Sequence, residues 1–291
     1  MDRLYQEAES ATEAYNKAEE QAGSLRRQIR QAQDRVARQQ ARVDALRDTL
    51  GALAGAQYRS GGLDPTLALL LSGSPDAYLE RATALDRIGA HQALRLKELQ
   101  ASLRELAQER AETARKFTAL EKNRKTVAQH KKAIERKLAT ARRLLDSLPT
   151  AERTAYERAS RSAGDVPDLR GSAAAPDGRA AAAVAAARSA LGHPYVWGAN
   201  GPAGFDCSGL MQWAYSHAGI GLPRTSQQQR YAGRRVPLSE ARPGDLVVYR
   251  NDASHVAMYV GNGMVIHAPH PGAAVRYDPV QMMPVSSVTR P

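Results

Sequence analysis

Residues 205–215 read FDCSGLMQWAY, and this stretch decides how the C-terminal part of the chain folds. Its apolar residues recur at the three- and four-residue spacing of an α-helix. Asp206 is a residue type that caps helix N-termini, so we expect Cys207 at the first helical position. The helix dipole and the free amide groups there favour the thiolate form of cysteine. Cys207 is the single cysteine of the chain, and its place predicts a nucleophile rather than a core residue.

A second stretch, downstream of the cysteine, predicts a β-hairpin. The segments His255–Val260 and Met264–Ala268 alternate in polarity on either side of the turn residues Gly261–Gly263. Their apolar positions are buried on one common face only if the loop contains all three turn residues. That loop makes His267 a diagonal neighbour of His255, at ~7–8 Å between backbones, which imidazole rings can bridge. The two histidines are therefore expected to converge.

A histidine that is oriented by a second polar group and faces a thiol is the Cys–His–X arrangement of cysteine peptidases. On this interpretation Cys207 is the nucleophile, His255 the general base and His267 the orienting group. The alternatives for the histidines are two partly exposed strand residues, or a metal site that includes the nearby His270. The metal alternative lacks a carboxylate ligand at short spacing and leaves the cysteine unexplained, so we expect no metal and no cofactor.

The first half of the chain carries a different pattern, an apolar ladder in alternating steps of four and three residues. One ladder runs from Leu4 to Leu53 and is broken at Gln39. A second ladder runs from Leu96 to Leu148. This spacing predicts supercoiled helices, and two of them joined by a short link predict an antiparallel coiled-coil hairpin. Charged residues occupy three positions of the second ladder, namely Arg110, Arg124 and Lys131.

Glycine and proline mark the boundaries between the parts of the chain. Residues 58–75 separate the ladders and enclose the apolar run Leu67–Leu71, which either caps the hairpin or docks a partner. Pro149 ends the second ladder, and a short helix is expected from there to about Ser160. The stretch that follows is rich in Gly, Pro, Ser and Ala, the composition of a linker. We therefore expect a coiled-coil domain at 1–160, a linker at 161–178 and a compact domain at 179–291.

Charge and hydropathy exclude some classes of function. The net charge of +11 is spread over both halves, so no nucleic-acid-binding arm is present and we expect no nucleic-acid partner. The excess of basic over acidic residues is consistent either with binding to an anionic polymer or with a helical surface exposed to solvent. The longest aliphatic run, Leu67–Leu71, is far short of the ~20 residues that span a bilayer. Charged residues begin at Asp2, so the chain is expected to be soluble, with a secretion signal removed before this numbering starts.

Five motifs occur in the C-terminal part, namely YVWG at 195–198, FDCSGL at 205–210, LPRTS at 222–226, PGDL at 243–246 and HV at 255–256. Over about residues 178–285 their order and spacing resemble those of the NlpC/P60 cysteine peptidases. The resemblance implies a papain-like fold and hydrolysis of bacterial stem peptides, typically between D-glutamate and diaminopimelate. It implies that Tyr195 lies beside the oxyanion and that His267 is the third polar residue of the site. It also implies that Asp206 and Ser208 flank the substrate.

The front half has a less specific resemblance. The segment Ser74–Arg81, which reads SPDAYLER, and the following Leu85–Ile88 are similar to coiled-coil segments of division-associated wall hydrolases. In those proteins the coiled coil docks on the FtsEX membrane complex and controls the enzyme. The resemblance therefore implies an FtsEX-type partner bound through Leu67–Ile88.

Together these observations predict an α+β chain, with an all-α antiparallel coiled-coil hairpin before a papain-like NlpC/P60 domain. We expect a secreted or cell-wall-associated DL-endopeptidase that acts on peptidoglycan. Two alternatives remain: an amidase of the CHAP type, and a regulatory scaffold in which the peptidase domain is idle. Because a long helical part is tethered to the enzyme by a short linker, we also expect the helices to cover the cleft near Cys207 and inhibit the enzyme.

Overall fold

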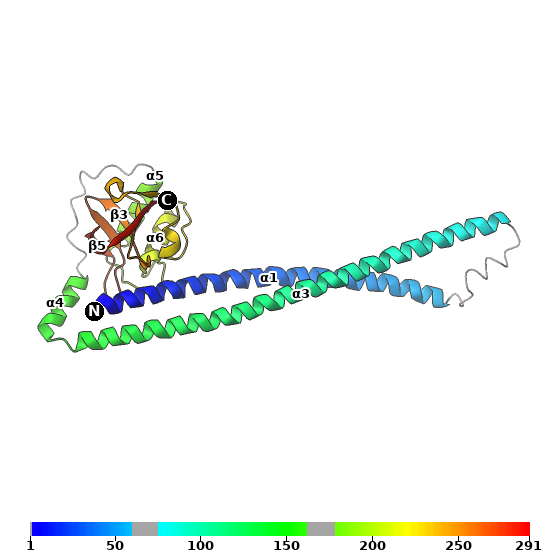
Figure 1. Cartoon of the computed structure of the whole chain (residues 1–291), viewed down its shortest axis with the longest axis horizontal. Helices are drawn as coiled ribbons and strands as arrows, with labels where there is room; N and C mark the ends of the chain where they lie inside the picture. Colours follow the sequence, from blue (N-terminus) through cyan, green and yellow to red (C-terminus); the bar gives the residue numbers. More distant parts are fainter. Residues whose placement is uncertain (1, 60–74, 162–177) are drawn as a thin grey trace. The chain divides into compact units, whose positions relative to one another are not determined.

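The computed structural model describes residues 2–59, 75–161 and 178–291, in which long helices precede an antiparallel sheet (Figure 1). It has two compact units, one made of Met1–Ala22 with Asn123–Pro291 and the other of Gly23–Lys122. None of the helices described is long and apolar enough to cross a membrane. The α-helices are α1 (Asp2–Arg59), α3 (Pro75–Asp146), α4 (Thr150–Arg161), α5 (Gly178–Ser189), α6 (Cys207–His217) and α7 (Ser226–Gln229). The strands are β1 (Arg234–Val236), β2 (Leu246–Tyr249), β3 (His255–Gly261), β4 (Met264–His267), β5 (Arg276–Pro279) and β6 (Val285–Arg290), with a 3-10 turn, η1 (Leu238–Glu240), after β1.

Within the unit Gly23–Lys122, helices α1 and α3 pair in opposite directions. Arg42 donates to Glu98 at 2.9 Å, whereas Gln40, which lies earlier in α1, accepts from Arg110 later in α3 at 2.7 Å. The antiparallel pairing of the two long helices is as predicted, and their supercoiling stays a prediction. The apolar residues buried along this pair come from the predicted ladders and include Ile29, Val43, Leu46, Leu106 and Leu120.

Polar residues in the ladders find partners on the opposite helix. Gln39, which breaks the first ladder, donates to the carbonyl of Ser102 at 3.1 Å and to the carboxylate of Glu105 at 2.9 Å. Arg110, in the second ladder, donates to Gln40. The breaks at Gln39 and Arg110 are therefore each compensated by hydrogen bonds between the helices, which help to fix their register.

Two sequence predictions fall on residues outside the described part. The apolar run Leu67–Leu71 lies wholly outside it, and the predicted linker 161–178 lies outside it apart from its two end residues. The short helix expected after Pro149 is present as α4.

The other unit contains the sheet. Its six strands are antiparallel to their neighbours, in the order β1-β6-β2-β3-β4-β5. Helices α5 and α6 pack together on one face, where the larger hydrophobic core gathers around Leu210, Met211 and Met258. The opposite face carries a smaller cluster that contains Val247 and Val288. The predicted α+β class is confirmed.

The hairpin of β3 and β4 has the predicted register but a different loop. Met258 pairs with Ile266 and Tyr259 with Val265, which is the alignment that brings the two histidines together. The connecting turn contains two residues rather than three, because a bulge between Tyr259 and Gly261 takes up the extra residue. The bulge explains how a shorter turn keeps the same face buried.

The first turns of α1 belong to the same unit as the sheet. They pair with the end of α3, where Lys137 bonds Glu7 and Asn123 donates to Gln21 at 3.3 Å. This part of α1 also buries four polar side chains to about 2% exposure, which is unusual for a helix with an apolar ladder. The four are Glu9, Thr12, Glu13 and Asn16.

Candidate active site

Cys207 is the first residue of α6, as the sequence predicts. The carboxylate of Asp206 caps the helix and accepts from the amide of Gly209 at 2.7 Å. The helix ends at His217 with Ala218 as its C-cap, and the φ of +74° at the following Gly219 suits a glycine after a helix C-terminus. Cys207 is 1% exposed. Its thiol therefore lies at a buried helix N-terminus.

The two histidines converge as expected. His255 begins β3 and His267 ends β4, and their Nε2 and Nδ1 atoms are 2.8 Å apart. The chain of contacts continues beyond them, because His267 Nε2 lies 2.7 Å from Oδ2 of Asp278 on β5. Asp278 in turn accepts from Nε of Arg276 at 2.8 Å. Neither Arg276 nor Asp278 of β5 was among the residues predicted to form the site.

The cysteine lies against the start of β3. Its Sγ is 4.0 Å from the carbonyl oxygen of Ser254 and receives a hydrogen bond from the amide of Val256. These two residues flank His255, so helix α6 brings the thiol to the strand end that carries the histidine. Tyr195 is buried in the same core, and its phenol pKa is raised well above 10 by burial and by the adjacent Cys207.

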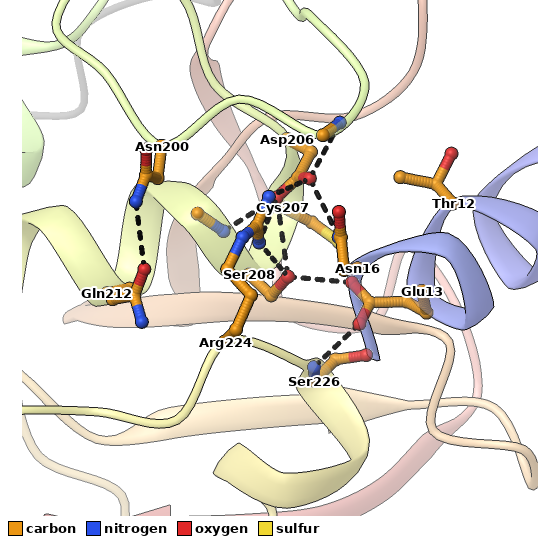
Figure 2. Close-up of polar contacts among 12 residues, drawn as sticks. Thr12, Glu13, Asn16, Asn200, Asp206, Cys207, Ser208, Gln212, Arg224 and Ser226 are labelled. Atoms are coloured by element: carbon orange, nitrogen blue, oxygen red, sulfur yellow. Dashed lines mark hydrogen bonds and ion pairs between the residues drawn. The ribbon is translucent and has the colours of Figure 1, made fainter. Parts of the chain in front are cut away.

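Asp206 and Ser208 belong to an ionic network with Arg224 (Figure 2). Arg224 donates to both carboxylate oxygens of Asp206, at 3.0 and 2.6 Å, and to Oγ of Ser208 at 3.0 Å. Asp206 also accepts from the amide of Gly198 at 3.0 Å. Arg224 belongs to the LPRTS motif, but no local pattern in the sequence predicts its contact with Asp206.

Helix α1 inserts a carboxyl group into this network. The Oε1 atom of Glu13 accepts from Ser208 Oγ at 2.7 Å and lies 3.6 Å from Sγ of Cys207, while Oε2 accepts from the amide of Ser226 at 2.9 Å. Figure 2 shows Glu13 and Asn16 reaching the site from α1. Asn16 donates to Asp206 at 3.0 Å. Cys207 and both residues beside it are therefore in contact with α1.

A second carboxylate of α1 faces the histidine. Oε1 of Glu9 lies 3.4 Å from Nδ1 of His255, and its other oxygen forms an ion pair with Arg250. Outside the cleft, the ring of Tyr5 stacks on that of His270 at 4.3 Å between centroids. Helix α1 therefore contacts both His255, through Glu9, and Cys207, through Glu13.

The carboxyl groups around the thiol change its ionisation. Burial, and then the nearby carboxylates of Glu13, Asp206 and Glu9, raise the pKa of Cys207 well above 9. The prediction that Cys207 is a thiolate is therefore wrong for this state. Burial and the three acidic residues disfavour the ionised form more than the helix dipole favours it. Burial also raises the pKa of Glu13 to about 8, with Asp206 as the second cause. At neutral pH the thiol and Glu13 are both protonated.

Comparison with known proteins identifies the part of the chain that holds this site. Residues 192–289 match the model of the NlpC/P60 family. A probable endopeptidase of Corynebacterium glutamicum is 44% identical over 126 residues, which cover 43% of this chain and 59% of that protein. The probable endopeptidase p60 of Listeria monocytogenes is 48% identical over 97 residues, which cover 33% of this chain and 20% of that protein.

The peptidoglycan hydrolase RipB of Mycobacterium tuberculosis is 35% identical, with a TM-score of 0.37, over 38% of this chain and 64% of that one. The chain spans 59% and 20% of the lengths of the two curated relatives above.

Proposed function

Because residues 192–289 form an NlpC/P60 domain, we propose that the chain is a secreted, cell-wall-associated peptidoglycan hydrolase. It acts as a DL-endopeptidase on stem peptides, at the bond between D-glutamate and diaminopimelate. Cys207 attacks the scissile carbonyl, and His255 serves first as general base and then as general acid. The observation that carries this proposal is the contact of the Cys207 thiol with the backbone on both sides of His255.

The remaining site residues have supporting roles. His267 orients His255 through the 2.8 Å contact between their rings. Tyr195 and the amide of Cys207 stabilise the oxyanion of the tetrahedral intermediate. Asp206 and Ser208 bind the substrate, a role supported by the hydrogen bonds that they exchange with polar groups of α1 in this state.

Digestion of purified peptidoglycan tests the proposed reaction. The chain opened by Glu13→Arg should release fragments whose masses place the cut after D-glutamate. Fragments with free L-alanine N-termini and sugars without peptide would instead identify a CHAP-type amidase. No fragments from the opened chain would favour the regulatory scaffold with an idle peptidase domain.

We further propose that α1 inhibits the enzyme. Glu13 occupies the positions at Ser208 and Ser226 where substrate would bind, and Glu9 faces the nitrogen of His255 that must accept the thiol proton. Both carboxyl groups are buried, and the thiol between them is neutral. Release of the first turns of α1 is therefore required before substrate can enter and Cys207 can ionise.

A partner that binds the released helices would activate the enzyme by mass action. The sequence resemblance points to an FtsEX-type membrane complex acting through Leu67–Ile88. We accordingly propose three functional parts: a regulatory helical domain at 1–160, a linker at 161–178 and the enzyme at 179–291.

The two histidines should differ in their sensitivity to substitution. In the opened chain, His255→Ala should be as inactive as Cys207→Ala, because nothing else accepts the thiol proton. His267→Asn should keep measurable activity, since an amide can still orient the ring of His255. Rates of fragment release from peptidoglycan measure both effects. Equal losses at the two positions would contradict this division of roles.

Inhibition should weaken as the pH rises. Docking raises the pKa of Glu13 from about 4.5 to about 8, since burial and Asp206 disfavour its charge, while Arg224 opposes them. A raised pKa stabilises the docked state at low pH, and this contribution is lost as the pH rises through 8. Docking should weaken by about 50-fold between pH 6 and 8. Glu9, whose pKa is lowered in the docked state, stays ionised over this range.

Alkylation of Cys207 by iodoacetamide measures this effect. The rate for the natural chain, divided by the rate for Glu13→Gln, should rise over that range, because glutamine cannot ionise. Because the thiol of Cys207 ionises with pH in both chains, dividing one rate by the other removes that common pH dependence. A ratio that stays flat from pH 6 to 8 would show that Glu13 does not couple docking to protons.

A further inference from the structure

Asp278 ends the chain of polar contacts that starts at the active-site histidines. Its Oδ2 atom accepts from Nε of Arg276 at 2.8 Å and lies 2.7 Å from Nε2 of His267. Burial alone would raise the pKa of Asp278, but its hydrogen bonds to His267 and Arg276 and their charges lower it. Asp278 is therefore an ionised carboxylate, which can only accept hydrogen bonds.

The carboxylate fixes which nitrogen of His267 carries the proton. Since Asp278 can only accept, Nε2 of His267 must donate. Burial lowers the pKa of His267 to about 4, so the ring has a single N–H at neutral pH. Its Nδ1 atom is consequently unprotonated and accepts the hydrogen bond across the 2.8 Å contact with His255 Nε2.

The same reasoning extends to His255. Its Nε2 carries the proton that it donates to His267, so in the neutral ring the lone pair is on Nδ1. That atom is buried and has no hydrogen-bond partner within the described residues. It lies 3.4 Å from Oε1 of Glu9 of α1, and Sγ of Cys207 lies 4.0 Å from the carbonyl oxygen of the preceding residue, Ser254. Once α1 leaves, Nδ1 is the atom able to accept the thiol proton.

We propose that Asp278, held by Arg276, is a positioning residue that sets the tautomers of both histidines and so directs the lone pair of His255 toward Cys207. The inference rests on the proposed cysteine peptidase function. It adds Asp278 to the site as a fourth residue, after Cys207, His255 and His267. Without the carboxylate, the hydrogen bond between the two histidines can reverse its direction. His267 would then donate from its Nδ1 atom to Nε2 of His255. The proton of neutral His255 would move to Nδ1 of that ring, where it blocks base catalysis.

Two substitutions separate positioning from structure. Asp278→Leu removes the acceptor and leaves a buried N–H of His267 without its partner, which favours the reversed relay. Asp278→Asn is the matched control, because both donors share one oxygen of Asp278 and an amide oxygen can accept from both. In chains also carrying Glu13→Arg, the Leu variant should lose about 10- to 100-fold in kcat. The Asn variant should stay within a few-fold of the parent.

Histidine tautomers provide a readout that does not depend on activity. Long-range ¹⁵N–¹H NMR spectra of the full chain opened by Glu13→Arg, in which Glu9 no longer faces Nδ1 of His255, should show Nε2–H forms for His255 and His267 when histidine is labelled and the pH is 7. The Asn variant should keep this pattern and the Leu variant should lose it. A Nδ1–H form of His267 in the opened chain, or unchanged tautomers in a folded Leu variant, would overturn the proposal. If the tautomers match but no variant cleaves peptidoglycan, the proposed function fails and the positioning role stands.

Discussion

The full chain carrying Glu13→Arg should release peptidoglycan fragments about 100-fold faster than the natural chain. Arginine removes the acceptor used by Ser208 and Ser226 and places a second guanidinium beside Arg224. A contact worth ~3 kcal/mol holds the open fraction below about one per cent, so losing it exposes nearly all molecules. Alkylation of Cys207 should accelerate by a similar factor.

Glu20→Arg provides the control for this experiment. It makes the same substitution, glutamate to arginine, at an exposed position of α1. Its rates should match those of the natural chain. If Glu13→Arg and Glu20→Arg both leave cleavage and alkylation unchanged, α1 is a passive spacer and the proposed inhibition is wrong.

Cys207→Ala should lower fragment release from the opened chain by at least about 10⁴-fold, because it removes the covalent route. The fold should persist, since the thiol is small and neutral in this state. The thermal unfolding midpoint, measured by circular dichroism, should stay within a few degrees of the parent. A residual rate above a tenth of the parent, in a folded variant, would disprove nucleophilic catalysis by this cysteine.

The parts of the site that follow local patterns could be predicted from the sequence. Asp206 has the chemistry of a helix cap, and this placed Cys207 at the helix start. The alternation of the hairpin set its register and brought His255 to His267. The bulge near Gly261 could not be anticipated, because two-residue and three-residue turns fit the same residues once a bulge is allowed.

Features that depend on contacts between residues far apart in the sequence could not be predicted. Glu9 and Glu13 look like ordinary solvated residues of an amphipathic helix, and only docking against the NlpC/P60 domain buries them. Asp278 lies on a short strand with little alternation, so nothing local aligned it with His267. The ionisation of Cys207 was mispredicted for the same reason, since the carboxylates that oppose the thiolate come from another part of the chain.

The order of these elements along the chain matters while the protein is being made. Glu13 precedes Cys207 by 194 residues. At ~5–20 residues per second, α1 leaves the ribosome about 10 to 40 seconds before the nucleophile does. The carboxyl groups of Glu9 and Glu13 therefore already exist when the NlpC/P60 domain first folds. Under the proposed inhibition, a nascent molecule closes its own cleft as it forms, without waiting for a second protein to bind.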